Sequence, residues 1–281
     1  MNDTNLEPLP VKELLRAFDL HPRKSLGQNF LLDGGSLNKI IRAADISPQD
    51  AVLEIGPGLG SLTRYLALSA RRVVAVEIDP YLFPILTQVL QPYDNVKLIL
   101  GDMLALDPAQ LMDGEPYVCI ANIPYYITSA LMRHLLEASL RPERVVFTMQ
   151  AEVAQRICAP EGKLSLLSLS VQVYGKPRVM AKLSAGAFYP PPKVDSATLR
   201  VDLYDTPRIA PEHLDTFFRL AKAGFSQKRK NLANSLSGGL GMDKPAVEAL
   251  LGSAEIDVSR RAETLRIDEW ARLCPLFAEN G

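Results

Sequence analysis

A short run after an apolar segment could hold the amino group of a planar base. The run is Ala121-Asn122-Ile123-Pro124-Tyr125-Tyr126, and it directly follows the apolar residues 117–120. We expect a buried strand to end at Asn122, because the proline prevents an ordinary helical continuation. In an open α/β sheet, ligands bind at the C-terminal ends of the strands. The Asn122 amide, the Pro124 carbonyl and the Tyr125 ring are therefore candidates for holding an exocyclic amine.

Three earlier predicted strands also end in residues that suit a ligand. The first is followed by Gly56-Pro57-Gly58-Leu59-Gly60, where glycines let a ligand approach the backbone without a Cβ clash. Glu77 ends the second strand, 21 residues after Gly56, and could accept hydrogen bonds from both hydroxyls of a ribose. Asp102 follows the third strand and could receive an adenine amino group. With Asn122, these strand ends predict a site for a cofactor that contains adenosine.

Two adenosine cofactors suit this layout, namely NAD and S-adenosylmethionine. A dinucleotide fingerprint reads G-x-G-x-x-G, whereas the turn here reads G-x-G-x-G. That spacing and the Asn-Ile-Pro-Tyr end of the fourth strand favour the methyl donor. The alternative for each acidic residue is a helix N-cap or a loop carboxylate.

Alternating strand and helix patterns would place these ends along one sheet edge. Strands are expected at residues 51–55, 72–77, 96–100, 117–121 and 144–149, with helical patterns between them. Because these strands are predominantly apolar, helices should cover both faces of the sheet. The predicted fold is therefore α/β, a Rossmann-like, mostly parallel methyltransferase sheet. Residues 178–183 and 197–204 are expected to close its edge as a β-hairpin, and residues 164–174 fit either a helix or a strand.

The pattern becomes all-helical after a proline-containing linker at residues 205–211. We expect a catalytic, cofactor-binding domain at residues 1–205 and a small helical domain, a candidate for binding nucleic acid, at residues 206–281. The second domain contains a window without acidic residues, 216–242, and its basic residues are Arg219, Lys222, Lys228, Arg229 and Lys230. Such a window is either a solvated helix face or a surface that grips nucleic acid.

Composition and charge limit the possible classes of protein. The chain is 47% hydrophobic and 22% charged, with a net charge of −1 from 31 basic and 32 acidic residues. These values are typical of a globular protein and exclude a globally basic nucleic-acid binder, but not a local basic face. Apolar runs are too short to span a bilayer, and residues 1–4 are unlike a secretion signal. The three cysteines and three histidines are scattered, so we expect a cytoplasmic protein without a metal.

Six motifs in order resemble the dimethyladenosine transferases that modify small-subunit ribosomal RNA, the kasugamycin-sensitivity type. The resemblance runs from residue 23 to about residue 273 and is carried by residues 24–31, 54–60, 122–126, 149–156, 188–196 and 225–232. Two segments depart from the family's usual pattern, residues 161–163 and residues 228–231. Both are expected to face RNA, so these departures bear on RNA contacts more than on catalysis.

The resemblance implies that the cofactor is S-adenosylmethionine. Carried over by position, its site would consist of Asn29, Leu31, Gly56, Glu77, Asp102 and Asn122. Asn29 and Leu31 would line the methionine end, and Gly56 would approach the cofactor closely. Glu77 would hold the ribose, and Asp102 would hold the adenine.

The resemblance also implies the substrate, which is 16S rRNA within a small ribosomal subunit or its precursor. The family puts two methyl groups on the N6 of each of two adjacent adenines in the 3′-terminal hairpin loop, and we expect this to be coupled to small-subunit maturation. The target base would be held by Asn122, Pro124, Tyr125 and Phe188. RNA backbone would be bound by Arg23, Lys24, Lys222, Lys228, Arg229 and Lys230. We expect the enzyme to be a monomer.

Three alternatives stay open from the sequence. The macrolide-resistance methylases of 23S rRNA share the cofactor site and the Asn-Ile/Leu-Pro-Tyr turn, although the stretch at residues 190–196 favours the small-subunit enzymes. A DNA adenine methylase would more typically carry Asp/Asn-Pro-Pro-Tyr/Phe. A non-catalytic RNA- or DNA-binding factor could retain the fold, but the intact Glu77, Asp102, Asn122 and Tyr125 argue against it.

Overall fold

The structure is a computed structural model that describes residues 6–122, 127–227 and 229–280. Its contacts divide the chain into two compact units. The first unit comprises Met1–Ala154 and Pro177–Leu203, and the second comprises Gln155–Lys176 and Tyr204–Gly281. The second unit thus takes in a segment from before residue 205, which the sequence pattern did not indicate. The division into domains at residue 205 stays a prediction.

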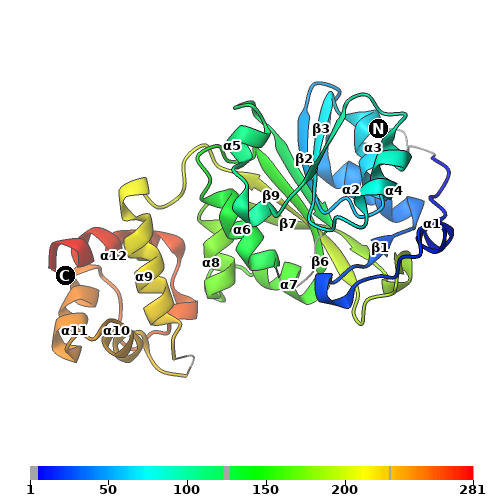
Figure 1. The fold of residues 1–281 in the computed structure, drawn as a ribbon. Helices are drawn as coiled ribbons and strands as arrows, with labels where there is room; N and C mark the ends of the chain where they lie inside the picture. The colour runs from blue at the N-terminus through cyan, green and yellow to red at the C-terminus, as the bar shows by residue number, and fades with distance from the viewer. Residues whose placement is uncertain (1–5, 123–126, 228, 281) are drawn as a thin grey trace. The chain divides into compact units, whose positions relative to one another are not determined.

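A seven-stranded sheet in the order β4-β3-β2-β5-β6-β9-β7 forms the framework of the first unit (Figure 1). Its strands are β2 (Ala51–Ile55), β3 (Arg72–Glu77), β4 (Val96–Leu100), β5 (Val118–Asn122), β6 (Arg144–Gln150), β7 (Gly175–Leu183) and β9 (Ser196–Leu203). β4, β3, β2, β5 and β6 are parallel, whereas β9 pairs with β6 antiparallel. The predicted α/β class and the hairpin at the sheet edge are confirmed.

Helices connect the strands, as the sequence pattern predicts. They are α1 (Val11–Ala17), α2 (Gly34–Ala44), α3 (Ser61–Ser69), α4 (Phe83–Leu90), α5 (Pro108–Leu111) and α6 (Thr128–Leu136), followed after β6 by α7 (Ala151–Ile157). Every residue of β2 is buried, which explains why four of its five residues are apolar, since helices cover a parallel sheet on both faces. β4 lies at the edge and keeps partly exposed side chains.

The register of the parallel strands brings their C-terminal ends together. Ile55 lies opposite Val76 on one side and Ala121 on the other, and Glu77 lies opposite Leu100. The predicted ligand residues that follow these positions therefore share one edge of the sheet.

A second, two-stranded sheet ties the N-terminal segment to the same region, and the sequence pattern did not predict it. β1 (Phe30–Leu31) pairs antiparallel with β8 (Phe188–Tyr189). Phe30 packs in a cluster with Val11 and Leu15 of α1 and with Leu59 of the glycine-rich turn. These contacts hold the residues around Phe30 beside the glycine-rich turn.

The second unit is helical. Its helices are α8 (Leu166–Gln172), α9 (Leu214–Gly224), α10 (Leu232–Leu240), α11 (Lys244–Ser253) and α12 (Ile267–Asn280). A capping box at Ser165 begins α8. Residues 164–174, whose sequence fits either a helix or a strand, thus contain a helix. Trp270 is fully buried, with its ring 6.4 Å from that of Phe217 and 6.3 Å from that of Phe225.

Two adjacent glycines of α10 offer a test of this packing. A Cβ at Gly239 would lie 2.7 Å from the Cα and Cβ atoms of Ala223 in α9, so the two backbones are in contact. We expect Gly239→Ala to lower the free energy of unfolding of the second unit by about 1–3 kcal/mol, as overpacking does. A Cβ at Gly238 meets only the movable end of Gln227, at 3.0 Å. Because alanine also favours a helix, Gly238→Ala should be neutral or slightly stabilising.

Urea unfolding followed by tryptophan fluorescence measures this difference, since Trp270 is the single tryptophan of the chain and lies in this core. Equal midpoints for the two alanine variants would contradict the close approach of α9 and α10.

Candidate active site

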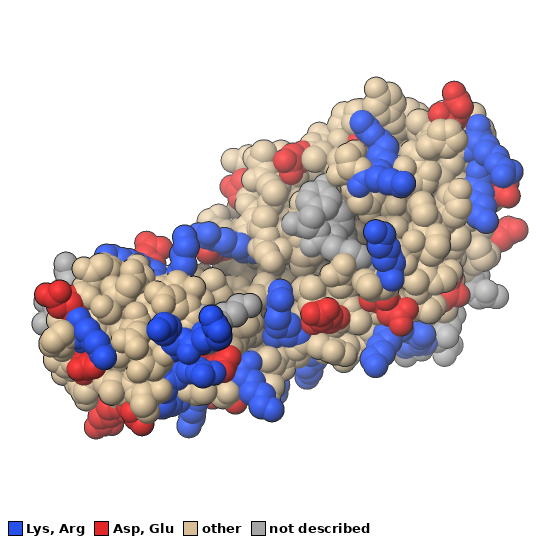
Figure 2. Space-filling view, turned by 90° about the horizontal axis from the view of Figure 1, so that it is seen from below, with Lys and Arg blue, Asp and Glu red and all other residues tan. Residues whose placement is uncertain are grey.

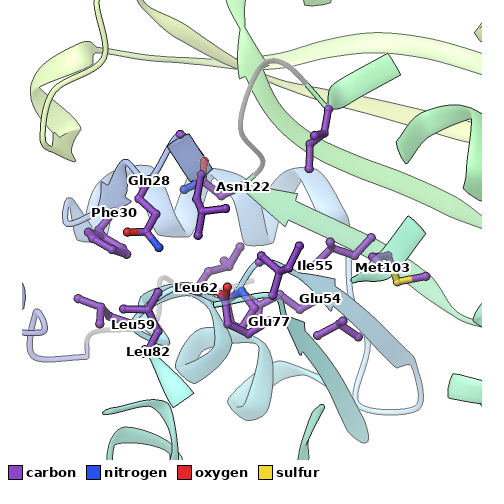
Figure 3. Close-up of a pocket in the computed structure, with 18 of the residues that line it drawn as sticks. Gln28, Phe30, Glu54, Ile55, Leu59, Leu62, Glu77, Leu82, Met103 and Asn122 are labelled. Carbon is purple, nitrogen blue, oxygen red and sulfur yellow. Dashed lines mark hydrogen bonds between the residues drawn. The ribbon is translucent and has the colours of Figure 1, made fainter. Parts of the chain in front are cut away.

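A cavity of about 290 Å³ opens at the C-terminal ends of β2, β3, β4 and β5 (Figure 3). All six residues predicted to bind the cofactor line it: Asn29, Leu31, Gly56, Glu77, Asp102 and Asn122. They come from the segment before α2, the glycine-rich turn and three strand ends. Most of the remaining lining is apolar, with side chains such as Leu59, Leu62 and Met103.

The glycine-rich turn has the backbone that glycine permits. Gly56, Gly58 and Gly60 have φ values of 70°, 62° and 85°, in the left-handed region that disfavours side chains. A Cβ added at Gly56 would meet no atom within 4 Å, because this position faces open space. A Cβ at Gly58 would lie 3.1 Å from the Phe30 ring. The turn thus leaves room for a ligand at Gly56 while packing tightly against β1.

Glu77 is a buried carboxylate held from two sides. Its side chain accepts hydrogen bonds from the backbone N–H of Gly58 (3.1 Å) and of Asp79 (2.9 Å). Burial raises the pKa of Glu77, and these backbone hydrogen bonds partly offset the rise. Each carboxylate oxygen has a second lone pair, so Glu77 can still accept hydrogen bonds from a ligand.

Glu54 is a second buried acid in the cavity, and the sequence analysis assigned it no role. It is 1% exposed, lies on β2 and points toward the same space as Glu77 (Figure 3). Burial raises its pKa from 4.5 to about 8; Thr63 opposes this rise and the charge of Glu77 adds to it. Its Oε2 atom has no hydrogen-bond partner within the described part of the chain. A charged residue inside an otherwise apolar strand is the signal that could have identified it.

Glu54 gives the protein a specific dependence of stability on pH. Between about pH 4.5 and 8 the folded protein keeps a proton on Glu54 that the unfolded chain releases. The free energy of unfolding is therefore unaffected by this group below pH 4.5 and decreases as the pH rises toward 8. We expect Glu54→Gln, which cannot titrate, to gain stability relative to the wild type as the pH rises, by about 3 kcal/mol near pH 7.

Denaturant unfolding of both proteins between pH 4.5 and 8 measures this effect. If the free energies of unfolding of the two proteins differed by the same amount at every pH, Glu54 would ionise normally. A change in packing caused by glutamine shifts this difference equally at all pH values.

Asn122, the last residue of β5, is held in a defined orientation. Its Nδ2 donates to the backbone carbonyl of Asn29 at 3.3 Å, and Asn29 in turn donates from its Nδ2 to the carbonyl of Gly27 at 3.0 Å. With the amide nitrogen engaged in this way, the Oδ1 atom of Asn122 is the group left to accept a hydrogen bond from a ligand. The amide also links β5 to the segment before α2.

Asp102 both lines the cavity and caps a turn. Its Oδ1 accepts from the backbone N–H of Leu104 at 2.9 Å, which begins a short 3₁₀ helix, Met103–Ala105. The N-cap alternative weighed from the sequence is therefore present in the structure. It does not exclude ligand binding, because a carboxylate has a second oxygen.

The predicted base-holding residues are only partly placed. Pro124 and Tyr125 lie outside the described residues. Phe188 is 5% exposed and packs in the core cluster that contains Leu31, which lies opposite it in the β1–β8 pair. Its ring is not among the described side chains that line the cavity. Its role as a stacking ring stays a prediction.

The predicted RNA-binding residues are exposed where they are described. Lys228 lies outside the described residues, whereas Lys24, Lys222, Arg229 and Lys230 are solvent-exposed. On the face drawn in Figure 2, Lys and Arg side chains are interspersed with Asp and Glu. Arg23 differs from the others, because its Nη1 makes an ion pair with the Oδ1 of the buried Asp79 at 3.0 Å.

Asp79 connects the N-terminal segment to β3, and the sequence analysis missed this role. In addition to Arg23, its carboxylate accepts from the Nε2 of Gln28 at 2.7 Å and from the backbone N–H of Tyr81 at 3.1 Å. Arg23 and Gln28 precede it by 56 and 51 positions, so no local pattern indicates these contacts.

Residues 6–122, 127–227 and 229–280 contain no group of three or more histidine, cysteine, aspartate or glutamate side chains placed to hold a metal ion. No helix within the same ranges is long and apolar enough to cross a membrane.

Sequence comparison adds an independent line of evidence. The family model described as "Ribosomal RNA adenine dimethylase" matches residues 20–279. A relative from Dehalococcoides mccartyi strain CBDB1, named ribosomal RNA small subunit methyltransferase A, is 47% identical over 271 residues, which are 96% of this chain and 93% of that one. A relative of the same name from Alkaliphilus metalliredigens is 41% identical over 278 residues, covering 96% of this chain and 97% of its own.

Two solved structures are similar in fold. A dimethyladenosine transferase from Plasmodium falciparum has a TM-score of 0.76 at 26% identity and covers 90% of this chain and 98% of its own. The 23S rRNA methyltransferase ErmE has a TM-score of 0.70 at 31% identity and covers 89% of this chain and 100% of its own.

Proposed function

The chain belongs to the ribosomal RNA adenine dimethylase family, and on that premise we propose that it dimethylates the N6 of two adjacent adenines in the 3′-terminal hairpin loop of 16S rRNA. The methyl donor is S-adenosylmethionine, and the substrate is a small ribosomal subunit or its precursor, whose maturation the reaction accompanies. The enzyme acts as a cytoplasmic monomer. The observation that carries the proposal is the single cavity in which the glycine-rich turn, Glu77, Asp102 and Asn122 meet.

The residues of the cavity fit S-adenosylmethionine. The open space at Gly56 admits a ligand against the backbone, and Glu77 keeps lone pairs for the ribose hydroxyls. Asp102 stands where the adenine amino group would lie, and Asn29 and Leu31 line the methionine end. When bound, the cofactor supplies a methyl group that its sulfonium already activates. The protein's task is then to present the nucleophile.

The adenine amine is a weak nucleophile, because its lone pair is delocalised into the ring. Asn122 Oδ1 accepts a hydrogen bond from one amine proton, and the Pro124 carbonyl accepts one from the other, which favours a pyramidal nitrogen aimed at the methyl group. Tyr125 stacks on the flipped base, and Phe188 is the second predicted ring. Alignment of the reactants provides most of the acceleration. No general base is required before the transfer.

Basic residues from two parts of the chain bind the RNA backbone. Lys222, Arg229 and Lys230 support this role by their exposure and by the absence of acidic residues from the window around them. Lys228 belongs to the same window, and Lys24 comes from the N-terminal segment. Arg23, which was predicted for the same role, is paired with Asp79. Several phosphate contacts would make the affinity fall steeply as salt increases.

The similarity to ErmE supports a second candidate, methylation of 23S rRNA. The relatives named small subunit methyltransferase A share more sequence with this chain, at 47% and 41% identity against 31%, and favour 16S rRNA.

Label transfer separates these candidates. Purified enzyme and methyl-labelled S-adenosylmethionine are offered small subunits, large subunits and duplex DNA, each lacking the modification. We expect label in the small subunits. Label in the large subunits or the DNA alone would overturn the proposal.

A further inference from the structure

A second, shallower cavity lies beside the cofactor site. It measures about 280 Å³ and shares Gln28 and Leu82 with the first cavity. Arg23, Asp79 and Tyr81 form much of its remaining wall. None of these three side chains has a part in the methyl transfer described above.

Tyr81 presents an exposed aromatic ring at this place. The residue is 61% exposed, the highest value among the large hydrophobic side chains that the structure describes. The guanidinium of Arg23 lies over the ring, 5.2 Å from its centroid. A single exposed aromatic residue needs no explanation on a protein surface, but a ring stacked with a guanidinium and set in a cavity offers a planar surface that a ligand can use.

The contacts of Asp79 determine what kind of ligand this surface suits. The Asp79 carboxylate is 1% exposed and pairs with Arg23, so the charges of the two groups compensate each other. Its bonds to Arg23 and Gln28 also fix both side chains before any ligand arrives. A surface that is planar, rigid and locally neutral favours a flat uncharged group over a phosphate. Rigidity also lowers the entropy lost on binding.

We infer that Tyr81 and Arg23 form a stacking site for an unpaired base of the RNA substrate, separate from the adenine that is methylated. The inference rests on the proposed function for the nature of the substrate. Proteins recognise RNA loops by splaying unpaired bases onto aromatic rings and guanidinium planes, and such stacking tolerates any base. The shared wall of Gln28 and Leu82 places this site next to the catalytic cavity, where the bases that flank the target must pass.

Steady-state kinetics on unmodified small subunits test the site. Tyr81→Ala should raise the KM for subunits about tenfold, with kcat and the Kd for S-adenosylmethionine unchanged, and Tyr81→Phe should behave like the wild type. Leu68→Ala is the matched control, since Leu68 is 56% exposed on α3 and lies outside both cavities. An unchanged KM in Tyr81→Ala, or a weakened affinity for S-adenosylmethionine, would overturn the inference.

A second measurement does not depend on methyl transfer. A Tyr81→Trp protein is titrated with a single-stranded oligoribonucleotide and with a blunt RNA duplex, with wild type supplying the background of the buried Trp270. Quenching by the single strand but not by the duplex is expected. Equal quenching by both, or none, would overturn the stacking site. If wild-type enzyme fails to methylate any subunit while this quenching occurs, the proposed function fails and the base-stacking site stands.

Discussion

An Asn122→Ala enzyme should lose methyl transfer almost completely while still binding S-adenosylmethionine. The Asn122 Nδ2 is engaged by the Asn29 carbonyl, so the remaining Oδ1 is oriented to accept a proton of the target amine. Removing one preorganised hydrogen-bonding group of this kind lowers kcat by about 10²–10³-fold in other enzymes. Asn122→Asp should be similarly impaired, because a carboxylate cannot donate to the Asn29 carbonyl and would lose its orientation.

Single-turnover methylation of small subunits measures this loss, and calorimetry with S-adenosylmethionine measures the binding that should remain. Asn95→Ala is the matched control. The Asn95 amide also donates to backbone carbonyls, those of Ala67 and Ala70, but it does not line the cavity. A rate for Asn122→Ala within threefold of the wild type would exclude Asn122 from the transfer step.

Glu77→Ala should have the largest effect on cofactor affinity. Hydrogen bonds to charged groups contribute about 1.5–3 kcal/mol each, so losing the bonds to two ribose hydroxyls should raise the Kd for S-adenosylmethionine at least about 100-fold. The substitution also leaves the buried N–H groups of Gly58 and Asp79 without their acceptor. We therefore expect some loss of stability as well.

Calorimetric titration with S-adenosylhomocysteine and S-adenosylmethionine separates these two effects. Glu115→Ala, in which an exposed carboxylate that pairs with Arg71 is removed, should keep the wild-type Kd. A folded Glu77→Ala protein with a Kd within fivefold of the wild type would show that the ribose is held elsewhere.

The sheet could be predicted from the sequence because its strands are locally encoded. Residues 51–55, 72–77 and 96–100 coincide with β2, β3 and β4, since each is a predominantly apolar segment that ends at a glycine or an acidic residue. Those strand ends in turn identified the lining of the cavity, because parallel strands bring their C-terminal ends to one edge. Site residues with a local sequence signature, such as Gly56 and Glu77, could therefore be predicted.

The remaining features depend on contacts between distant parts of the chain. β1 and β8 have two residues each, too few to show an alternating pattern. They form because Phe30 pairs with Tyr189 and Leu31 pairs with Phe188 across the two segments. The hydrogen bonds that Arg23 and Gln28 donate to Asp79 join residues more than 50 positions apart. The phosphate contact of Arg23 stays a prediction, and the structure shows this side chain paired with Asp79 and lying over the Tyr81 ring.

Glu54 shows a second limit of prediction from the sequence. The sequence places it in an apolar strand, but its raised pKa follows from complete burial next to Glu77, which only the packed structure reveals.

We propose that this cavity presents an adenine amine twice to a methyl donor. The most direct test is nucleoside mass spectrometry of small-subunit rRNA after incubation with the wild-type enzyme and S-adenosylmethionine, with the 3′-terminal hairpin isolated from the rest. We expect N6,N6-dimethyladenosine at two adjacent positions of the hairpin loop and none with Asn122→Ala. Methylation on another atom or another nucleoside, or outside the hairpin, would contradict it.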